Sequence, residues 1–360
     1  MKKMVVKLGS SVIAPKGKLD QKLVAAIVAD IFNAKKAGYE VVIVSSGAIA
    51  CGLNRLGHKA KPKEMHALMA IASVGQIILM DAFDKKFCAK KSLCAQILLT
   101  WADFDNRERY VNIRKTIDTL LKMGVTPVIN ENDAVTSEEI RFGDNDWTSA
   151  RVADLLDADI LVILSDVKGL YDGVKLVKRV EKIDHKIKAL VRKENKTHTH
   201  GGMDTKLEAA TSAGYAGIKT VIALGREKNV LTRIAQGEAV GTLFVPMKQK
   251  ENARKRWIFS KQIKGTLTVD DGARHALLCE NKSLLSVGVV KVDGEFHKGD
   301  AVAVVDCGGV SLGCGIANYS SDQIIPKTKL ESELIHHDNF IREAQGWCYS
   351  PYRYSVKKDF

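Results

Sequence analysis

Short, mostly continuous runs of apolar residues alternate with amphipathic stretches over the first two thirds of the chain. The apolar runs occupy residues 4–8, 41–44, 95–99, 126–129, 160–164 and 220–223. Apolar positions recur with helical spacing over residues 20–37, 64–87, 106–123, 147–157 and 204–216. Continuous apolar runs are typical of strands that are buried on both faces. The pattern therefore predicts an α/β domain, an α-β-α sandwich around a mostly parallel open sheet.

The pattern changes near residue 247. Residues 247–264 carry seven Lys and Arg against one Glu, and beyond them short strand-like runs are separated by closely spaced glycines such as Gly294 and Gly299. A chain of 360 residues also exceeds the size that one hydrophobic core usually serves. We therefore expect a large catalytic domain over 1–246, a basic linker over 247–264, a small all-β barrel over 265–345 and a C-terminal tail over 346–360.

Composition points to an intracellular protein. We see no apolar run near the roughly 20 residues that cross a bilayer, and the N-terminus enters a strand-like run and not the apolar core of a signal peptide. The seven cysteines are scattered without any C-x-x-C spacing, so we expect reduced thiols and no cysteine metal site. We predict a cytoplasmic location and no membrane partner.

The formal net charge of +13 raises a nucleic-acid-binding protein as an alternative. Binding to a phosphate backbone needs clustered Lys and Arg, whereas residues 265–345 carry seven basic residues against twelve acidic ones. The basic segment 247–264 either contacts RNA or forms a solvated interdomain helix that complements the acidic barrel. We favour the second interpretation and expect no RNA partner.

The first candidate chemistry lies at the ends of two apolar runs. Lys7 stands inside an apolar strand, so its ammonium group needs an anion, either a core carboxylate or a phosphate that approaches past Gly9. Ser46 and Gly47 follow the run 41–44 where a helix is expected to start. The free N–H groups there favour a bound anion, unless Ser46 is only an N-cap.

Carboxylates and amides gather in two neighbouring segments. Asn130-Glu131-Asn132-Asp133 is followed by Gly143-Asp144-Asn145-Asp146. Such groups suit a ligand that has both an ammonium group and carboxylates. They are also able to hold Mg²⁺ beside phosphate oxygens, with Asp144 as the candidate metal ligand. The alternative for either segment is a solvated polar loop.

Two further segments suit a nucleotide. Ser165 and Asp166 end the run 160–164, where an ordinary turn is the alternative, and the segment from Gly201 to Lys206 opens a helix like a phosphate-binding turn. No stretch fits the G-x-x-x-x-G-K-[ST] loop. Jointly, two lysines, two glycine turns and a carboxylate–amide cluster predict phosphoryl transfer. A carboxylate acceptor, with a free pKa of about 4.3, needs no general base.

Six segments, in this order, resemble the amino-acid kinase family, and within it the members that phosphorylate the side-chain carboxylate of L-glutamate. They are VVKLGSS, SSGAI, VINEND, GDND, SDVKGLY and GGMDTK. The segments TVDDGA at 268–273, GEFHKGD at 294–300 and IHHDN at 335–339 are similar to a PUA domain. The resemblance covers nearly the whole chain and implies the amino-acid kinase fold with an appended PUA barrel, ATP as phosphoryl donor and Mg²⁺.

The resemblance also implies roles for particular residues. Lys7 and Lys206 would flank the transferring phosphoryl group, and Asp146 would hold both lysines in place. The residues implied for glutamate binding are Ser46, Gly47, Asp133 and Asn145. The residues implied for ATP binding are Lys7, Gly9, Ser165, Asp166, His200, Gly201, Gly202, Met203, Asp204, Thr205 and Lys206.

Members of this family are often homo-oligomers, dimers or tetramers, and they are commonly inhibited by proline. A glutamyl phosphate reductase consumes their product. The resemblance therefore implies these partners here. Three positions depart from the family pattern: Trp147, the pair Thr199-His200, and Asp204. We expect altered kinetic constants for nucleotide and metal from them. The nearest rival is a kinase of the same fold that acts on acetylglutamate, aspartate, uridylate or a carbamate, but Asp133 with Asn145 favours a free α-ammonium group.

Overall fold

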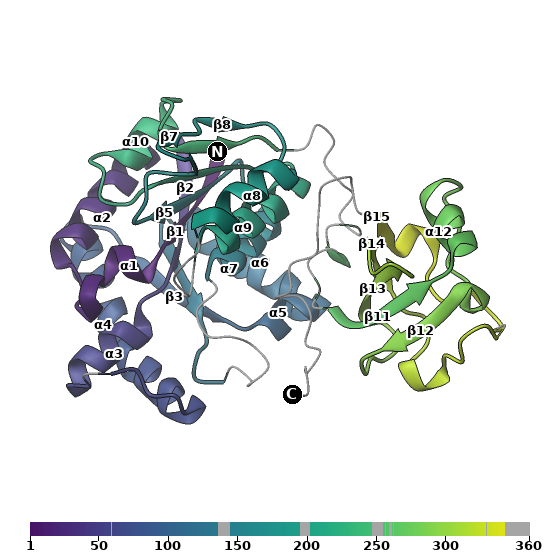
Figure 1. Cartoon of the computed structure of the whole chain (residues 1–360). Helices are drawn as coiled ribbons and strands as arrows, with labels where there is room; N and C mark the ends of the chain where they lie inside the picture. Colours follow the sequence, from purple (N-terminus) through teal and green to yellow (C-terminus); the bar gives the residue numbers. More distant parts are fainter. Residues whose placement is uncertain are drawn as a thin grey trace. The chain divides into compact units, whose positions relative to one another are not determined.

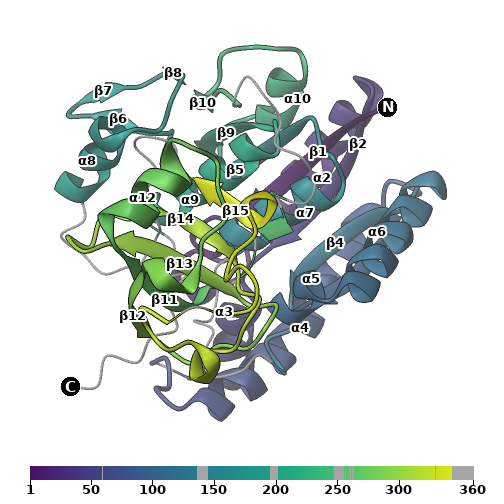
Figure 2. The same cartoon turned by 90° about the vertical axis from the view of Figure 1, so that its right-hand side faces the viewer.

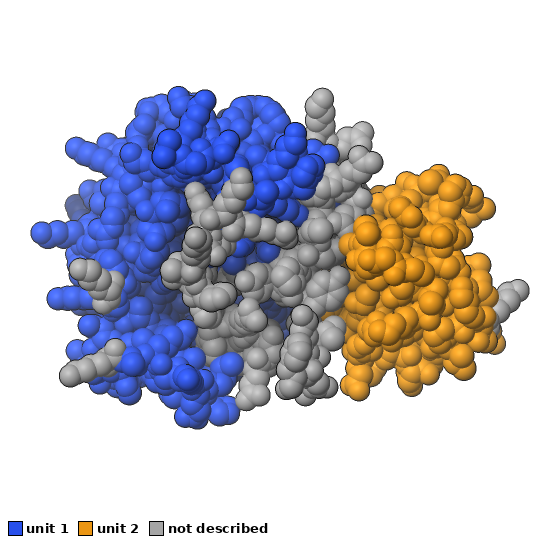
Figure 3. Space-filling view, in the orientation of Figure 1, with its two compact units in different colours: residues 1–249 blue, residues 250–360 orange. Residues whose placement is uncertain are grey.

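The computed structural model describes residues 1–58, 60–135, 145–194, 202–246, 255, 257–258, 261, 263–328 and 330–342. It divides into two compact units, residues 1–249 and residues 250–360 (Figure 3). Most of the expected linker, 247–264, and all of the expected tail, 346–360, lie outside the described residues. The limits of those two segments therefore stay predictions.

The first unit is built on an eight-stranded sheet with strand order β3-β4-β2-β1-β5-β9-β10-β8 (Figure 1). Its strands are β1 (Lys2–Leu8), β2 (Tyr39–Ser45), β3 (Cys94–Leu99), β4 (Thr126–Glu131), β5 (Ile160–Ser165), β8 (Arg179–Val180), β9 (Lys219–Leu224) and β10 (Thr242–Phe244). Neighbouring strands pair in parallel except β9 and β10. This confirms the predicted mostly parallel sheet.

Helices connect these strands and cover both faces of the sheet. They are α1 (Ser10–Ile13), α2 (Gln21–Lys36), α3 (Ala48–Leu56), α4 (Met65–Cys88), α5 (Trp101–Asp105), α6 (Arg107–Lys122), α7 (Asn145–Leu155), α8 (His185–Glu194), α9 (Met203–Tyr215) and α10 (Val230–Ala235). A short hairpin, β6 (Tyr171–Asp172) and β7 (Lys175–Leu176), follows β5.

The alternation of side chains along β1 decides which face each residue serves. Met4, Val6 and Leu8 belong to a core that includes residues of α2, α4 and α10. Val5 belongs to the opposite core, which includes residues of α6, α7 and α9. Lys7 stands two residues after Val5 on the same strand, so its side chain leaves the sheet on the α7 and α9 face.

Helix α4 corrects one expectation from the sequence. The helix has 24 residues, and its most apolar stretch of 18 residues has a mean hydropathy of 1.5. It is therefore long and apolar enough to cross a membrane. The prediction that no apolar run approaches that length was therefore too strict. The buried residues Leu68, Ile71, Gly75 and Leu79 recur on one side of α4, which packs against α2 and α3. This spacing is that of a core helix.

The second unit contains a five-stranded sheet of order β12-β11-β13-β14-β15 (Figure 2). Its strands are β11 (Ile263–Val269), β12 (Val289–Asp293), β13 (Ala301–Asp306), β14 (Ser311–Ile316) and β15 (Phe340–Arg342). This confirms the predicted small domain of short strands. It also contains a helix that the glycine-rich pattern did not reveal, α12 (Asp271–Leu278), whose N-cap Asp270 accepts the Ala273 N–H at 2.9 Å.

Candidate active site

Two lysines from distant parts of the first unit meet on one carboxylate. Lys7 of β1 lies 2.6 Å, Nζ to Oδ1, from Asp146 in the first turn of α7. Lys206 in the first turn of α9 lies 3.2 Å, Nζ to Oδ2, from the same side chain. The structure thus brings together the three residues that were expected to be catalytic.

The three charged groups are almost completely buried: Lys7 and Lys206 are each 5% exposed and Asp146 is 1% exposed. Burial by itself raises the pKa of Asp146, but the charges of Lys7 and Lys206 outweigh it and lower that pKa to about 2. Asp146 is therefore ionised at any physiological pH. Together these three side chains carry a net positive charge, because two ammonium groups face one carboxylate.

The start of α9 is tied to the same carboxylate. Thr205 donates its hydroxyl to Asp146 Oδ2 at 2.7 Å and contacts the Gly202 carbonyl at 3.0 Å. Lys206 also donates to that carbonyl at 3.4 Å. Gly9 lies beside Lys7, since a Cβ atom at Gly9 would stand 3.6 Å from Lys7 Nζ. The two expected phosphate turns therefore converge on Asp146.

A second group of polar side chains surrounds Asn145, which directly precedes Asp146. Asn145 Nδ2 lies within hydrogen-bond distance of Ser46 Oγ at 2.9 Å, Asn130 Oδ1 at 3.0 Å and the Ser45 carbonyl at 3.1 Å. Asn145 is 3% exposed, and among the described residues its Oδ1 has no hydrogen-bond donor. A buried acceptor without a donor is costly, so it suits a bound ligand that donates.

Gly47 adopts a φ of +110° between β2 and α3, a conformation that favours glycine. It turns the chain from Ser46 at the strand end into α3, so Ser46 and the first N–H groups of α3 lie together. This local geometry agrees with the anion-binding helix start expected at Ser46 and Gly47.

Asp133 lines a cavity of about 200 Å³. The wall includes Gln76 and Ile77 of α4, Leu98 of β3, and residues 131–134 at and after the end of β4. Gln76 accepts a hydrogen bond from Asn130 Nδ2 at 2.7 Å, so the wall of the cavity is linked through Asn130 to Asn145. Burial raises the pKa of Asp133 to about 6, although the charge of Lys61 opposes the shift. The volume is below the roughly 300–1,000 Å³ of pockets for drug-sized ligands, so the cavity would take only a smaller group.

The end of β5 lies next to the end of β1. Leu8 and Leu164 are partners in the parallel register, and Gly9 donates its N–H to the Leu164 carbonyl at 3.4 Å. Ser165 is buried and its hydroxyl donates to Asp166 Oδ1 at 3.0 Å, while Asp166 is exposed. The carboxyl ends of β1 and β5, which were expected to bind ATP, therefore lie side by side.

Three expected residues lie outside the part of the chain that the structure describes: Asp144, His200 and Gly201. Their roles stay predictions. Gln76 was missed from the sequence. A glutamine within the mostly apolar stretch 67–80 was the signal in the sequence that pointed to it.

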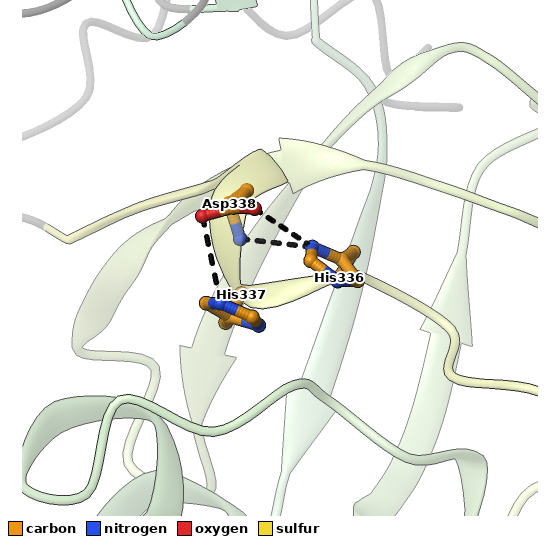
Figure 4. A group of neighbouring side chains, drawn as sticks. All are labelled: His336, His337 and Asp338. Atoms are coloured by element: carbon orange, nitrogen blue, oxygen red, sulfur yellow. Dashed lines mark hydrogen bonds and ion pairs between the residues drawn. The ribbon is translucent and has the colours of Figure 1, made fainter.

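Within the described residues, one group of three side chains has the composition of a metal site: His336, His337 and Asp338 of the second unit (Figure 4). His336 Nδ1 accepts the Asp338 N–H at 3.1 Å and so caps the 3-10 turn His337–Asn339. A metal at that nitrogen would need the lone pair that forms the cap. The group therefore has a structural explanation.

The two units match two known families. Residues 2–224 match the amino acid kinase family, and residues 265–338 match the PUA domain. Among solved structures, a carbamate kinase from Giardia lamblia is 21% identical, with a TM-score of 0.48, and covers 68% of this chain and 99% of its own.

Curated relatives extend over nearly the whole chain. The glutamate 5-kinase of Methylococcus capsulatus is 43% identical over 94% of this chain and 97% of its own length. The glutamate 5-kinase of Thermoanaerobacter sp. is 40% identical over 96% of this chain and 98% of its own length. The glutamate 5-kinase of Bordetella pertussis is 43% identical over 94% and 96%. These relatives therefore span both units.

Proposed function

The chain belongs to the amino acid kinase family, among the glutamate 5-kinases, and from this premise we propose that it transfers the γ-phosphoryl group of ATP to the side-chain carboxylate of L-glutamate. The product is L-glutamyl 5-phosphate, which lies on the route to proline. The observation that carries the proposal is the pair of buried lysines, Lys7 and Lys206, held by Asp146 at 2.6 and 3.2 Å.

In the transfer, an oxygen of the substrate's side-chain carboxylate forms a bond to the γ-phosphorus, and the bond from that phosphorus to the β–γ bridging oxygen breaks. ADP leaves with the electron pair of the broken bond. The acceptor is already ionised at neutral pH, so no proton has to be removed. What the protein supplies is alignment and positive charge on the transferring oxygens, which is the role we assign to Lys7 and Lys206.

Asp146 acts through the lysines. A buried ammonium group without a counter-ion is costly and tends to lose its proton. The carboxylate gives both ammonium groups a counter-ion and fixes their positions before ATP arrives. Thr205 restrains the same carboxylate through its 2.7 Å hydrogen bond, which keeps the start of α9 next to the lysines. Gly9, Ser165, Asp166 and the turn at Gly202 would enclose the phosphates and the nucleotide.

Glutamate would bind on the Asn145 side of the site. The Oδ1 of Asn145, which has no donor among the described residues, and the carboxylate of Asp133 are acceptors for an α-ammonium group. Ser46 and the helix start at Gly47 would face a carboxylate. Acetylglutamate lacks a charged ammonium group and would not supply that partner to the Asp133 carboxylate. This difference favours glutamate over acetylglutamate, uridylate and a carbamate. Aspartate has an α-ammonium group as well, so the comparison of acceptors has to separate it from glutamate.

Mg²⁺ fits this site only with help from the nucleotide. Asp146 already pairs with Lys7 and Lys206 and accepts a hydrogen bond from Thr205. The candidate metal ligands at the carboxyl ends of the strands are then Asp166, which is described and exposed, and Asp144, which stays a prediction. Mg²⁺ commonly uses one or two carboxylates together with phosphate oxygens and water. When bound there, it would offset charge on the phosphate oxygens.

The proposal extends to the setting of the enzyme. We place it in the cytoplasm, as a homo-oligomer, dimer or tetramer, with proline as a feedback inhibitor that competes at the glutamate site. The acyl phosphate product is labile in water, so a glutamyl phosphate reductase is the expected consumer.

Hydroxylamine traps an acyl phosphate as a hydroxamate, and this reaction provides the test. The purified chain, given ATP, Mg²⁺ and L-glutamate, should form glutamyl hydroxamate, and added proline should raise the KM for glutamate. Acetylglutamate, aspartate and carbamate serve as competing acceptors. Turnover of acetylglutamate equal to that of glutamate would defeat the assignment.

A further inference from the structure

A cluster of three aromatic rings encloses a buried arginine beside the proposed active site. Arg151 is 3% exposed, and its Cζ atom lies 5.2 Å from the ring centre of Trp101, 5.1 Å from that of Phe104 and 5.6 Å from that of Trp147. Trp101 and Trp147 stack with centroids 5.7 Å apart and an interplanar angle of 24°. We call these four residues the tryptophan–arginine cluster.

The cluster joins α5 to α7, the helix that carries Asn145 and Asp146. Trp147 directly follows Asp146, and Arg151 lies four residues further on, so both side chains leave the same face of α7. Trp101 and Phe104 belong to α5, which begins three residues after Leu98 in the wall of the Asp133 cavity. The cluster therefore connects the helix of the phosphoryl site to the strand end of the glutamate site.

Burial of a guanidinium group in a protein core costs free energy, because its charge loses contact with water. Its charge is compensated by the faces of the rings and by Asp105, whose Oδ1 lies 3.6 Å from an Arg151 terminal nitrogen. Apolar side chains of similar volume often give equal or greater stability. A planar cation between rings, however, allows few alternative arrangements, and so it fixes how α7 is rotated against α5.

We infer that the tryptophan–arginine cluster is a positioning device that holds Asp146, and through it Lys7 and Lys206, in the geometry that phosphoryl transfer needs. Trp147 and Arg151 are buried beneath α5 and are positioning residues, not catalytic ones. This inference rests on the proposed function. A change that loosens the first turn of α7 should act on the transfer step more than on the binding of either substrate.

The test measures kcat, both KM values and the melting temperature for the wild type, Trp147→Ala and Trp147→Phe in the hydroxamate assay. A displacement of about 1 Å at reacting groups lowers rates by up to about 100-fold, so we expect Trp147→Ala to lose about 10- to 100-fold in kcat. Its KM values should change by much less. Trp147→Phe keeps an aromatic face over Arg151 and should recover most of kcat.

Two further variants separate positioning from stability. Phe32→Ala removes a ring that lies 5.7 Å from Lys35 and 5.9 Å from Phe87 on the opposite face of the sheet, so it should lower the melting temperature and leave kcat unchanged. Arg151→Lys keeps the charge but not the planar fork. It should lower kcat even if Trp147→Ala does not fold.

The outcomes are distinct. If Trp147→Ala or Arg151→Lys folds and keeps wild-type kcat, the inference is wrong. It is also wrong if Phe32→Ala loses as much kcat as the cluster variants at a similar loss of melting temperature. A wild-type chain that forms no hydroxamate from glutamate would instead overturn the proposed function, and this inference with it.

Discussion

At the scale of single residues, the charges at the site follow from burial and pairing. A lysine within an apolar strand could be identified from the sequence as a group in need of an anion, and Lys7 has found Asp146 at 2.6 Å. The partner itself was implied only by resemblance. Gln76, Arg151 and Trp101 were not predicted as site residues, because their contacts join segments that are far apart along the chain.

Removal of either proposed catalytic ammonium group should abolish most of the activity. We expect Lys7→Met and Lys206→Met each to lower kcat by at least about 100-fold, as for the loss of one donor to a developing charge. Hydroxamate formation measures the effect. Lys35→Met is the matched control. Lys35 is half-buried and donates to Thr126 Oγ1 at 2.7 Å, and Thr126 begins β4 at the amino end of the parallel strands, opposite the proposed site. A control variant as inactive as the other two would contradict the assignment.

The raised pKa of Asp133 predicts a pH dependence of glutamate binding. With a pKa of about 6, Asp133 is ionised at pH 7 and mostly neutral at pH 5, where it no longer attracts an ammonium group. The KM for glutamate should therefore rise by about tenfold from pH 7 to pH 5, whereas Asp146, with a pKa of about 2, keeps its charge.

Asp133→Asn provides the comparison for that pH profile. Its KM for glutamate should be high at every pH, with little change between pH 5 and pH 7, because the titrating carboxylate is gone. A profile for this variant that parallels the wild type would show that another group titrates. Initial rates at saturating ATP are sufficient for the measurement.

At the scale of elements, the six strands and five long helices that were predicted in the first unit lie within about two residues of their predicted limits, because buried strands and amphipathic helices have different periods. The short strands β6, β7, β8 and β10 were not predicted. Helices α1, α5, α8, α10 and α12 were not predicted, and only the start of α3 was. Helix α3, with nine residues, directly follows β2 and Gly47. Its start was predicted as an anion-binding turn, but its length was not predicted. Helix α12 lies among the glycines that predicted strands.

Helices α3 and α4 meet backbone to backbone at two glycines. A Cβ atom at Gly75 would lie 1.8 Å from the Ala48 carbonyl oxygen, and one at Gly52 would lie 1.9 Å from the Ile71 carbonyl oxygen. Neither backbone has room to move without separating the helices. Ala48 follows Gly47, so this close approach also fixes the helix start proposed for glutamate binding.

Gly75→Ala should therefore destabilise the first unit by about 1–3 kcal/mol or more, as overpacking of a core does. Thermal unfolding measures the loss, and the KM for glutamate should rise as well. Gly214→Ala in α9 is the control, because a Cβ atom there meets nothing within 4 Å and alanine is the better helix former. A melting temperature equal for the two variants would contradict the packing argument.

At the scale of the whole molecule, the division into two units was predictable because the hydrophobic pattern and the spacing of glycines both change near residue 247. Each unit has its own buried core. The acidic composition of residues 265–345, with seven basic against twelve acidic residues, still argues against an RNA-binding second unit.

A chain that ends at Gln249 should keep its activity. All described residues of the proposed site and both cores of the sheet lie in residues 1–249. We expect hydroxamate formation with kcat and KM values like those of the full chain, together with a cooperative thermal transition. A folded truncated chain without activity would mean that the second unit takes part in catalysis.

The salt bridges at Asp146 also connect the order of synthesis to the onset of activity. Lys7 belongs to the first strand of the sheet and Lys206 comes 199 residues later. A growing polypeptide that has not yet reached α9 contains Lys7 and its partner Asp146, but it lacks Lys206, the second cation proposed to act on ATP. We therefore expect ribosome-bound fragments that end before Lys206 to form no glutamyl hydroxamate.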